Sequence, residues 1–398
     1  MGNFIQQFSD RVSIIASDRL WLEDAALQQA KTTSNLPGMH RVVGLPDLHP
    51  GRGYPVGAAF FSVGRFYPAL VGNDIGCGMA LWQTDLLAGK AKLDKMDKQL
   101  GNLDELVDDD EWISLEHFDP ALTGRVEALS VALRTAGLDT AHLRSLGTIG
   151  RGNHFAELQV VDQIECGETL SKTVLAPKCL QLLVHSGSRG LGQAILSGHV
   201  DEHGHSGLVE GEPAALAYLR LHDLAVQFAE VNRAVIAARI FRRLRCDAER
   251  VLDVNHNTVT PAHIDGRQGW LHRKGATPSD RGLVMLPGSR DDYSYLIEPV
   301  ADQGALSLHS LAHGAGRKWQ RTDCKDRLVR LATPSQLSRT SLGGRVICND
   351  RALIYEEAPQ AYKNVDSVLG SLVGAGLARV VYRSKPLLTY KTRGECCE

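Results

Sequence analysis

The chain has 398 residues, a formal net charge of −2, 43% hydrophobic and 23% charged residues. This composition is that of an ordinary globular protein, and it excludes nucleic-acid binding through a strongly basic overall field. The sequence has no run of about 18 apolar residues, so no membrane span is predicted, and the polar start, residues 1–10, does not predict a secretory signal.

The predicted elements are mostly short. In chain order they are a helix over residues 20–31, strands over 42–45, 57–63 and 69–72, a helix over 119–136, a glycine-rich turn within 148–158, a buried strand over 179–184, a helix over 213–245 and an apolar run over 251–254. The helix over 213–245 is the clearest, because Pro213 suits its first turn and Leu221, Leu224, Phe228, Val231 and Val235 form one apolar stripe. Irregular alternation predicts an α+β fold, and the lack of a firm linker predicts one large domain over 1–398.

The cysteines and arginines indicate the environment of the protein. Eight cysteines are scattered without a CxxC pair, at Cys77, Cys166, Cys179, Cys246, Cys324, Cys348, Cys396 and Cys397. Without a secretory signal, this pattern favours reduced thiols in a cytoplasmic protein. The basic stretch 239–245 (RIFRRLR) suits either phosphate recognition or a solvated helix end.

Residues of metal-binding types follow several of the apolar runs. Asp74 and Cys77 follow residues 69–71, and three histidines lie in a glycine-rich turn or at strand ends, at His154, His185 and His256. Strand ends can present such side chains from a rigid scaffold. A thiolate, a carboxylate and imidazoles suit a divalent transition metal, and softness alone favours zinc. Taken singly, each of these histidines, and Cys77, is more often a buried structural residue than a metal ligand.

The segment His313-Gly314-Ala315-Gly316-Arg317 predicts a different function. Its small residues let the backbone approach a bulky ligand, and bare amides there can hold a phosphate or a nucleobase. A histidine can also act as a nucleophile that forms a covalent intermediate. An ordinary glycine-rich turn remains the alternative.

Eight motifs occur in one order along the chain. They are LPDLHPGRGYPVGAAF (45–60), GNDIGCGM (72–79), GRGNHFAEL (150–158), VHSGSRGLG (184–192), NHN (255–257), LPGSRDDYSYL (286–296), HGAGR (313–317) and EEAPQAYKNVD (356–366). Together they resemble the RtcB family of RNA ligases, over about residues 42–391. Eight motifs in register are far more specific than any one of them.

The resemblance implies a fold, an activity and a set of site residues. The fold would have mixed β-sheets around a central metal and nucleotide cleft, with flanking helices. The enzyme would join RNA 3′-phosphate or 2′,3′-cyclic phosphate ends to 5′-hydroxyl ends, using GTP and two Mn²⁺ ions, in RNA repair or tRNA splicing. Manganese would replace the zinc that softness favours. Cys77 would bridge the ions, with Asp74 and His154 at one and His185 and His256 at the other, and His313 would become guanylylated.

The resemblance also implies guanine nucleotide contacts. They are Asn153, Phe155, Glu157, Asn257, Pro287, Gly288, Ser289, Ser294, Gly314, Ala315, Gly316 and Lys391. Asp47 and His49 would either support the metal ligands or serve as turn residues.

The chain departs from the family at one of these motifs. Members commonly read PGSMGT where this chain has Arg290, Asp291 and Asp292 after the serine. Two acidic residues there would repel a triphosphate, and Arg290 would offset them. The chain also continues beyond Lys391 through Cys396 and Cys397, where family members often stop.

Two other functions fit parts of the pattern. A dinuclear metal phosphodiesterase or phosphatase acting on RNA ends would use the same ligands but would not need His313 and its glycines. A non-catalytic RNA-binding protein would not need the ligand set at all. For the ligase, RNA is the expected partner, an archease-type helper is compatible, no membrane is involved, and a monomer is the default.

Overall fold

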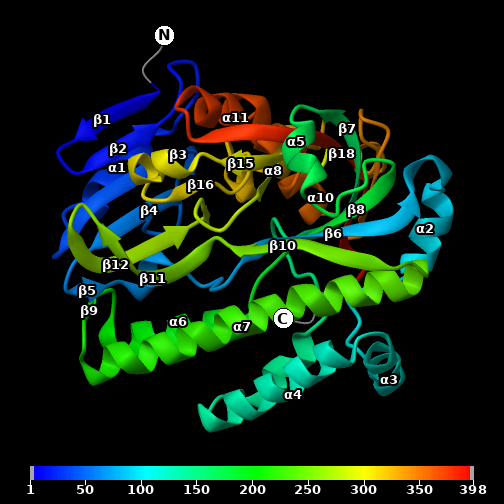
Figure 1. The fold of residues 1–398 in the computed structure, drawn as a ribbon, viewed down its shortest axis with the longest axis horizontal. Helices are drawn as coiled ribbons and strands as arrows, with labels where there is room; N and C mark the ends of the chain where they lie inside the picture. Colours follow the sequence, from blue (N-terminus) through cyan, green and yellow to red (C-terminus); the bar gives the residue numbers. More distant parts are fainter. Residues whose placement is uncertain (1–3, 395–398) are drawn as a thin grey trace.

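Two mixed β-sheets lie side by side in the computed structural model, which describes residues 4–394 (Figure 1). Cys396 and Cys397 fall outside these residues. The first sheet has the strand order β1 (Ile5–Ser9), β2 (Val12–Ile15), β3 (Met39–His49), β4 (Val56–Ser62), β12 (Arg267–Lys274), β11 (Asn257–Ile264). Helices and sheets are not arranged in a regular alternation, so the predicted α+β class is confirmed.

The second sheet carries most of the candidate site. Its order is β10 (Ala248–Asn255), β6 (Gly78–Leu87), β8 (Cys179–Ser186), β7 (Phe155–Ile164), β18 (Ala378–Thr392), β15 (Ser294–Pro299), β14 (Val284–Pro287), and β17 (Arg345–Cys348) pairs with β18 in parallel. Two small ladders join β13 (Ala276–Pro278) to β16 (Ser310–Ala312) and β5 (Arg65–Phe66) to β9 (Leu208–Val209). Strand β18 follows every other strand in the sequence, yet it lies inside the sheet between β7 and β15.

The helices cover the sheets and extend from them. The α-helices are α1 (Asp24–Thr33), α2 (Leu93–Leu100), α3 (Asp109–Phe118), α4 (Pro120–Thr135), α5 (Gly167–Ser171), α6 (Gly190–His203), α7 (Pro213–Leu244), α8 (Arg321–Leu328), α9 (Pro334–Leu337), α10 (Leu353–Glu356) and α11 (Val365–Gly374). Short 3₁₀ turns are η1 (Pro68–Leu70), η2 (Ala88–Lys90), η3 (Thr140–Ser145), η4 (Ala301–Ser307) and η5 (Pro359–Ala361). Among residues 4–394, no helix combines the length and apolar character needed to cross a bilayer.

Helix α7 is the long element that supports the site from behind. It runs beneath both sheets, with α6 beside it and α4 on its far side (Figure 1). Leu224, Phe228, Val231 and Val235 of the predicted stripe are buried, so the predicted helix and its apolar face are confirmed. Leu221 is only partly buried at the edge of this face.

Two of the predicted elements differ from the structure. The segment predicted as a strand over 69–72 is instead the 3₁₀ turn η1, because Pro68 stands at its first position with a fixed φ and cannot donate to a ladder. The helix predicted from residue 20 begins at Asp24, whose carboxylate lies in the first turn and suits the helix dipole. The helix predicted over 119–136 is confirmed as α4, with Asp119 accepting from Leu122 N as its cap.

In the basic stretch over 239–245, Arg245 is an exposed helix end, as one alternative predicted, whereas the other three arginines bind a carboxylate of the protein itself. Arg239 is fully buried, and its guanidinium donates to both carboxylate oxygens of Glu111 on α3, at 3.1 and 3.0 Å. Arg242 and Arg243 reach the same carboxylate at 3.3 and 3.1 Å. One buried acid therefore binds three arginines, and the cluster fastens α3 to α7.

Candidate metal centre and nucleotide pocket

The order of strands in the second sheet brings the metal-type residues to one edge. Strand β6 begins directly after Cys77, β7 begins directly after His154, β8 ends just after His185, and β10 ends just before His256. The register pairs Gly78 with both Ser186 and Asn255, and Phe155 with His185. Because neighbouring antiparallel strands run in opposite directions, two strand starts and two strand ends meet at the same edge.

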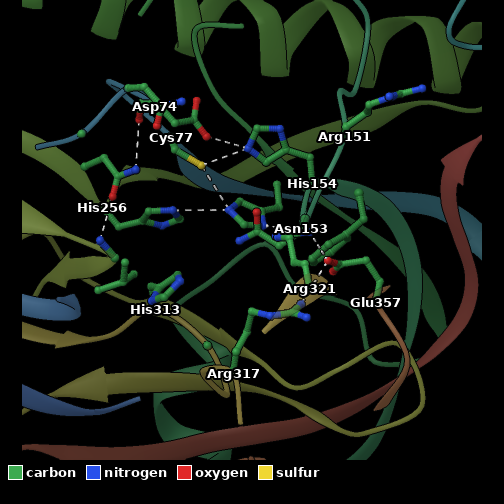
Figure 2. A pocket seen from close by; sticks show the side chains of 18 of the residues that line it. Asp74, Cys77, Arg151, Asn153, His154, His256, His313, Arg317, Arg321 and Glu357 are labelled. Carbon is green, nitrogen blue, oxygen red and sulfur yellow. Dashed lines mark hydrogen bonds and ion pairs between the residues drawn. The ribbon is translucent and has the colours of Figure 1, made fainter. Parts of the chain in front are cut away.

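The donor atoms of these residues surround the sulfur of Cys77. Cys77 Sγ lies 3.3 Å from His154 Nε2 and 3.2 Å from His185 Nε2. His154 Nε2 also lies 2.8 Å from Asp74 Oδ2, and His185 Nε2 lies 3.3 Å from His256 Nε2. Figure 2 shows His154 and His256 close to Cys77, with His313 beyond His256.

Two donor triads share the thiol. Within one triad, Asp74, Cys77 and His154, and within the other, Cys77, His185 and His256, all donor atoms lie within 4.8 Å of one another. Thiol, carboxylate and imidazole donors suit divalent transition metals. The residues therefore fit two divalent ions that share one sulfur ligand.

Burial and neighbouring charges shift the pKa values of the donor residues, and so set their protonation states. Burial, together with the charge of neighbouring histidines, lowers the pKa of His185 and of His256 well below the usual range, so both are neutral ligands near pH 7. Burial alone would raise the pKa of Asp74, but the charge and hydrogen bond of His154 bring it to about 2. Burial and the nearby Asp74 carboxylate raise the pKa of Cys77, an effect that a bound cation reverses.

Glycines permit the close approach of the chain at this centre. Gly76 has φ +73°, and a Cβ there would lie 2.8 Å from Val226 Cα of α7. A Cβ on Gly187 would lie 2.0 Å from Asp74 Oδ1, so the carboxylate occupies the space that this glycine leaves. The glycines of the motifs therefore seat the Asp74–Cys77 loop between α7 and the end of β8.

Two polar residues of α7 hold the ligand-bearing loops from behind, and the sequence did not single them out. Arg233 is fully buried and donates to Gly76 O at 2.9 Å, to Ser186 O at 3.0 Å, and to the side chains of Asp253 and Asn255 at 2.7 and 2.6 Å. Asn232 accepts from Gly147 N at 2.8 Å and donates to Gly187 O at 3.2 Å. The sequence feature that could have identified them is a pair of polar residues within a helical face that is otherwise apolar and buried.

His313 lies beside the second triad. It follows β16, and its ring centroid is 4.9 Å from that of His256. Its Nδ1 lies 2.6 Å from Asp47 Oδ2, and the same oxygen accepts from the His313 backbone N at 3.1 Å. Asp47 therefore supports His313, whereas the sequence analysis placed it beside the metal ligands or in a turn. His49 Nδ1 contacts the backbone oxygen of Asp47 at 2.8 Å, and His49 lines the cavity.

A cavity of about 1380 Å³ contains the centre. All the site residues expected from the sequence line the cavity except Ser294, which is buried behind the lining residues. Ser294 Oγ accepts from Gln159 Nε2 at 3.0 Å, and this amide also donates to Glu157 Oε1 at 2.8 Å. Asn257 links the loop that carries Asp74 to the residue that follows β12. Its amide donates to Asp74 O at 3.0 Å and accepts from Gly275 N at 2.7 Å.

The far end of the cavity is formed by charged side chains. Glu357 accepts from Arg317 and Arg321 at 3.2 and 2.5 Å (Figure 2). It also lies 3.6 Å from Lys391 Nζ. Burial would raise the pKa of Glu357, but these three cations hold it far below its usual range. Burial raises the pKa of Glu157 to about 7, although hydrogen bonds from Gln159 and Thr389 and the charge of Lys391 oppose the shift.

Comparison with known proteins places the chain among RNA ligases. The tRNA-splicing ligase RtcB family matches residues 29–392. The chain is 56% identical over 394 residues to the RNA-splicing ligase RtcB2 of Escherichia coli, covering 99% of both chains. It is 32% identical over 462 residues to the tRNA-splicing ligase RtcB of Nanoarchaeum equitans, covering 96% of this chain and 95% of that one. The corresponding protein of Thermococcus kodakarensis is 28% identical over 440 residues, with 92% and 90% covered.

Proposed function

Because the chain belongs to the RtcB family of RNA ligases, we propose that it seals RNA 3′-phosphate or 2′,3′-cyclic phosphate ends to 5′-hydroxyl ends, using GTP and manganese. The observation that carries this proposal is the position of His313. Its imidazole lies next to His256 of one donor triad, inside a single cavity that also holds the other triad. A nucleophile beside two metal-type sites suits phosphoryl transfer.

Asp74, Cys77 and His154 would hold one manganese ion, and Cys77, His185 and His256 would hold the other. When bound, these ions would neutralise charge on the nucleotide and RNA phosphates. The protein's own part is to keep the donors neutral or anionic in one buried place, which the burial of the two imidazoles and the low pKa of Asp74 support.

The chemical steps follow from the position of the His313 ring. Nδ1–H would donate a hydrogen bond to the Asp47 carboxylate, which keeps the proton on Nδ1 and leaves the Nε2 lone pair for attack; Nε2 has no hydrogen-bond partner within residues 4–394. Nε2 attacks the α-phosphorus of GTP and pyrophosphate leaves, giving a histidine–GMP intermediate. The RNA 3′-phosphate then takes the GMP to form an RNA–ppG anhydride. Attack by the 5′-hydroxyl joins the strands and releases GMP.

The nucleotide would extend from His313 to Lys391. Gly314, Ala315 and Gly316 would face its phosphates, and Glu157 and Lys391 would contact guanine. This arrangement is supported by the cavity, because one cavity is lined by all of these residues and also by Asn153, Phe155, Asn257, Pro287, Gly288 and Ser289. Ser294 would act through Gln159, which also positions Glu157.

The wider assignment follows the same family relationship. We expect residues 1–398 to act as one catalytic domain, in the cytoplasm and as a monomer, in RNA repair or tRNA splicing. An archease-type helper is compatible with this role. The RNA substrate would enter the cavity where Arg52, Arg144 and Arg151 line its wall.

The test is covalent labelling followed by a sealing assay. Mixing the protein with α-labelled GTP and Mn²⁺ is expected to leave an alkali-stable, acid-labile label on the wild type and on His263→Ala, an exposed histidine outside the cavity, but none on His313→Ala. RNA ends bearing 3′-phosphate and 5′-hydroxyl should then be joined, and 3′-hydroxyl ends should not. An unlabelled wild type that only removes phosphate from RNA ends would establish a hydrolase instead.

A further inference from the structure

The two acids at the position where the chain departs from its family bind other parts of the protein. Asp291 Oδ1 accepts from Ser341 Oγ at 2.9 Å. Asp292 Oδ2 accepts from Val365 N at 3.4 Å, at the first residue of α11. Neither acid lines the cavity, so the expected repulsion of a triphosphate is wrong. Asp292 instead helps to fix the start of α11, which follows Lys363 closely in the chain.

Strand β3 bulges where it carries Asp47. Its ladder with β4 pairs through Gly44 and resumes at His49, so the buried residues 45–48 leave the regular pairing. Bulges redirect side chains and are frequent beside active sites. Backbone groups that leave a ladder need other partners when they are buried. The shape of this bulge therefore depends on which groups bind residues 45–48.

Lys363 supplies the donors that the bulge needs. The residue is 4% exposed, and its Nζ donates to Pro46 O at 3.0 Å and to Leu48 O at 2.7 Å. These two carbonyl groups belong to the neighbours of Asp47 on either side. The backbone N of Lys363 also donates to Gly316 O at 2.9 Å. One residue thus ties the bulge to the glycine-rich segment that follows the candidate nucleophile.

The same bulge carries a buried charge. The Asp47 side chain is completely buried, its Oδ2 lies 2.6 Å from His313 Nδ1, and its Oδ1 has no hydrogen-bond partner within residues 4–394. A buried carboxylate is costly unless donors or opposite charges compensate it. Burial lowers the pKa of Lys363 only to about 8, so its side chain is a cation near pH 7. Because Nζ binds both flanking carbonyl groups, this positive charge lies beside Asp47.

We propose that Lys363 is a positioning residue for the attack by His313: its hydrogen bonds hold the β3 bulge so that Asp47 meets His313 Nδ1, and its charge compensates the buried carboxylate. This inference rests on the proposed function, because it assumes that His313 reacts with GTP. Lys363 does not line the cavity, so it takes no part in binding the nucleotide or the metals. Its effect on the reaction passes through Asp47.

The experiment is a double-mutant cycle on the rate of guanylylation. Lys363→Gln, which keeps amide donors without the charge, and Lys363→Met, which removes both, are each made in the wild type and in Asp47→Asn. Single-turnover labelling with α-labelled GTP and Mn²⁺ gives the rate, and GTP affinity and manganese content are measured beside it. Arg239→Gln removes another buried cation, outside the cavity, and controls for lost stability.

Each lysine variant is expected to label about ten- to a hundredfold more slowly than the wild type. GTP affinity and manganese content should stay at the wild-type level, and Arg239→Gln should keep the wild-type rate. In Asp47→Asn, the same lysine substitutions should cause no further loss, because the carboxylate through which Lys363 acts is already absent. If Lys363→Met fails to fold with two unpaired carbonyl groups, Lys363→Gln still gives the cycle.

Three results would overturn the inference. The first is a wild-type rate in a folded lysine variant. The second is a pair of independent losses that multiply in the double variant, which would show that Lys363 does not act through Asp47. The third is a loss of GTP affinity or manganese that accounts for the slower labelling, which would leave Lys363 only a structural role. A wild type that takes no label would instead refute the proposed function.

Discussion

Asp47 Oδ2 lies 2.6 Å from His313 Nδ1, and the Asp47 side chain is completely buried. This pair joins β3 of the first sheet to the loop after β16 and fixes which nitrogen of His313 faces the cavity. The arrangement parallels catalytic histidines whose orientation is set by a buried carboxylate.

Asp47→Asn is expected to slow the guanylylation of His313 by at least about tenfold. The amide can donate toward Nδ1, which favours the tautomer with the proton on the attacking Nε2. Manganese content should stay at the wild-type level, because Asp47 belongs to neither donor triad. Single-turnover labelling with GTP measures the rate, and an unchanged rate would show that the pair is only structural.

Cys77→Ala should abolish binding of both metal ions, whereas His154→Ala should keep one. The reason is that Cys77 is common to the two triads and His154 belongs to one. Metal per chain, measured by mass spectrometry after gel filtration, gives the count. Cys246→Ala, which removes a buried thiol outside the cavity, is the matched control; a Cys77→Ala protein that retains two ions would rule out a shared sulfur.

Arg233→Lys should weaken metal binding roughly ten- to a hundredfold. Lysine keeps the charge but cannot reach the Gly76 and Ser186 oxygens together with Asp253 and Asn255, so the ligand loops lose their support. Arg239→Lys is the matched control, because Arg239 is equally buried on α7 but anchors Glu111. If both variants lose metal in proportion to their loss of unfolding free energy, the effect is general destabilisation.

Guanosine affinity measured without metal should rise about tenfold per pH unit up to about pH 7 and then level off. Burial raises the pKa of Glu157 to about 7, above its ordinary value. Below that pH the group is protonated in the free protein and must release its proton before it can accept from the base. Glu157→Gln has no such titration and should give a flat profile. The same slope in both proteins would assign the titration elsewhere.

Local sequence patterns predicted most of the helices and strands. The partners of individual side chains depend on residues that are distant in the sequence, and these were not predicted. The helix α7 was predictable because its apolar spacing is a local property, and the strand over 69–72 was wrong because Pro68 precedes it. The metal-donor candidates were predicted from the order of the family motifs. Residue spacing could not predict them, because Cys77 and His256 are far apart in the sequence. Asp47 and Arg239 were misassigned because their partners, His313 and Glu111, lie 266 and 128 positions away.

The position of β18 in the sheet has a consequence for folding during translation. The strand is synthesised after every other strand, yet both β7 and β15 pair with it. A nascent polypeptide can already carry all of its metal donors while two inner strands still expose unpaired backbone, which invites proteolysis and aggregation. Translation that stops before Ala378 therefore yields a protein without β18 and without Lys391, and the cell gains no partly active ligase from an interrupted message.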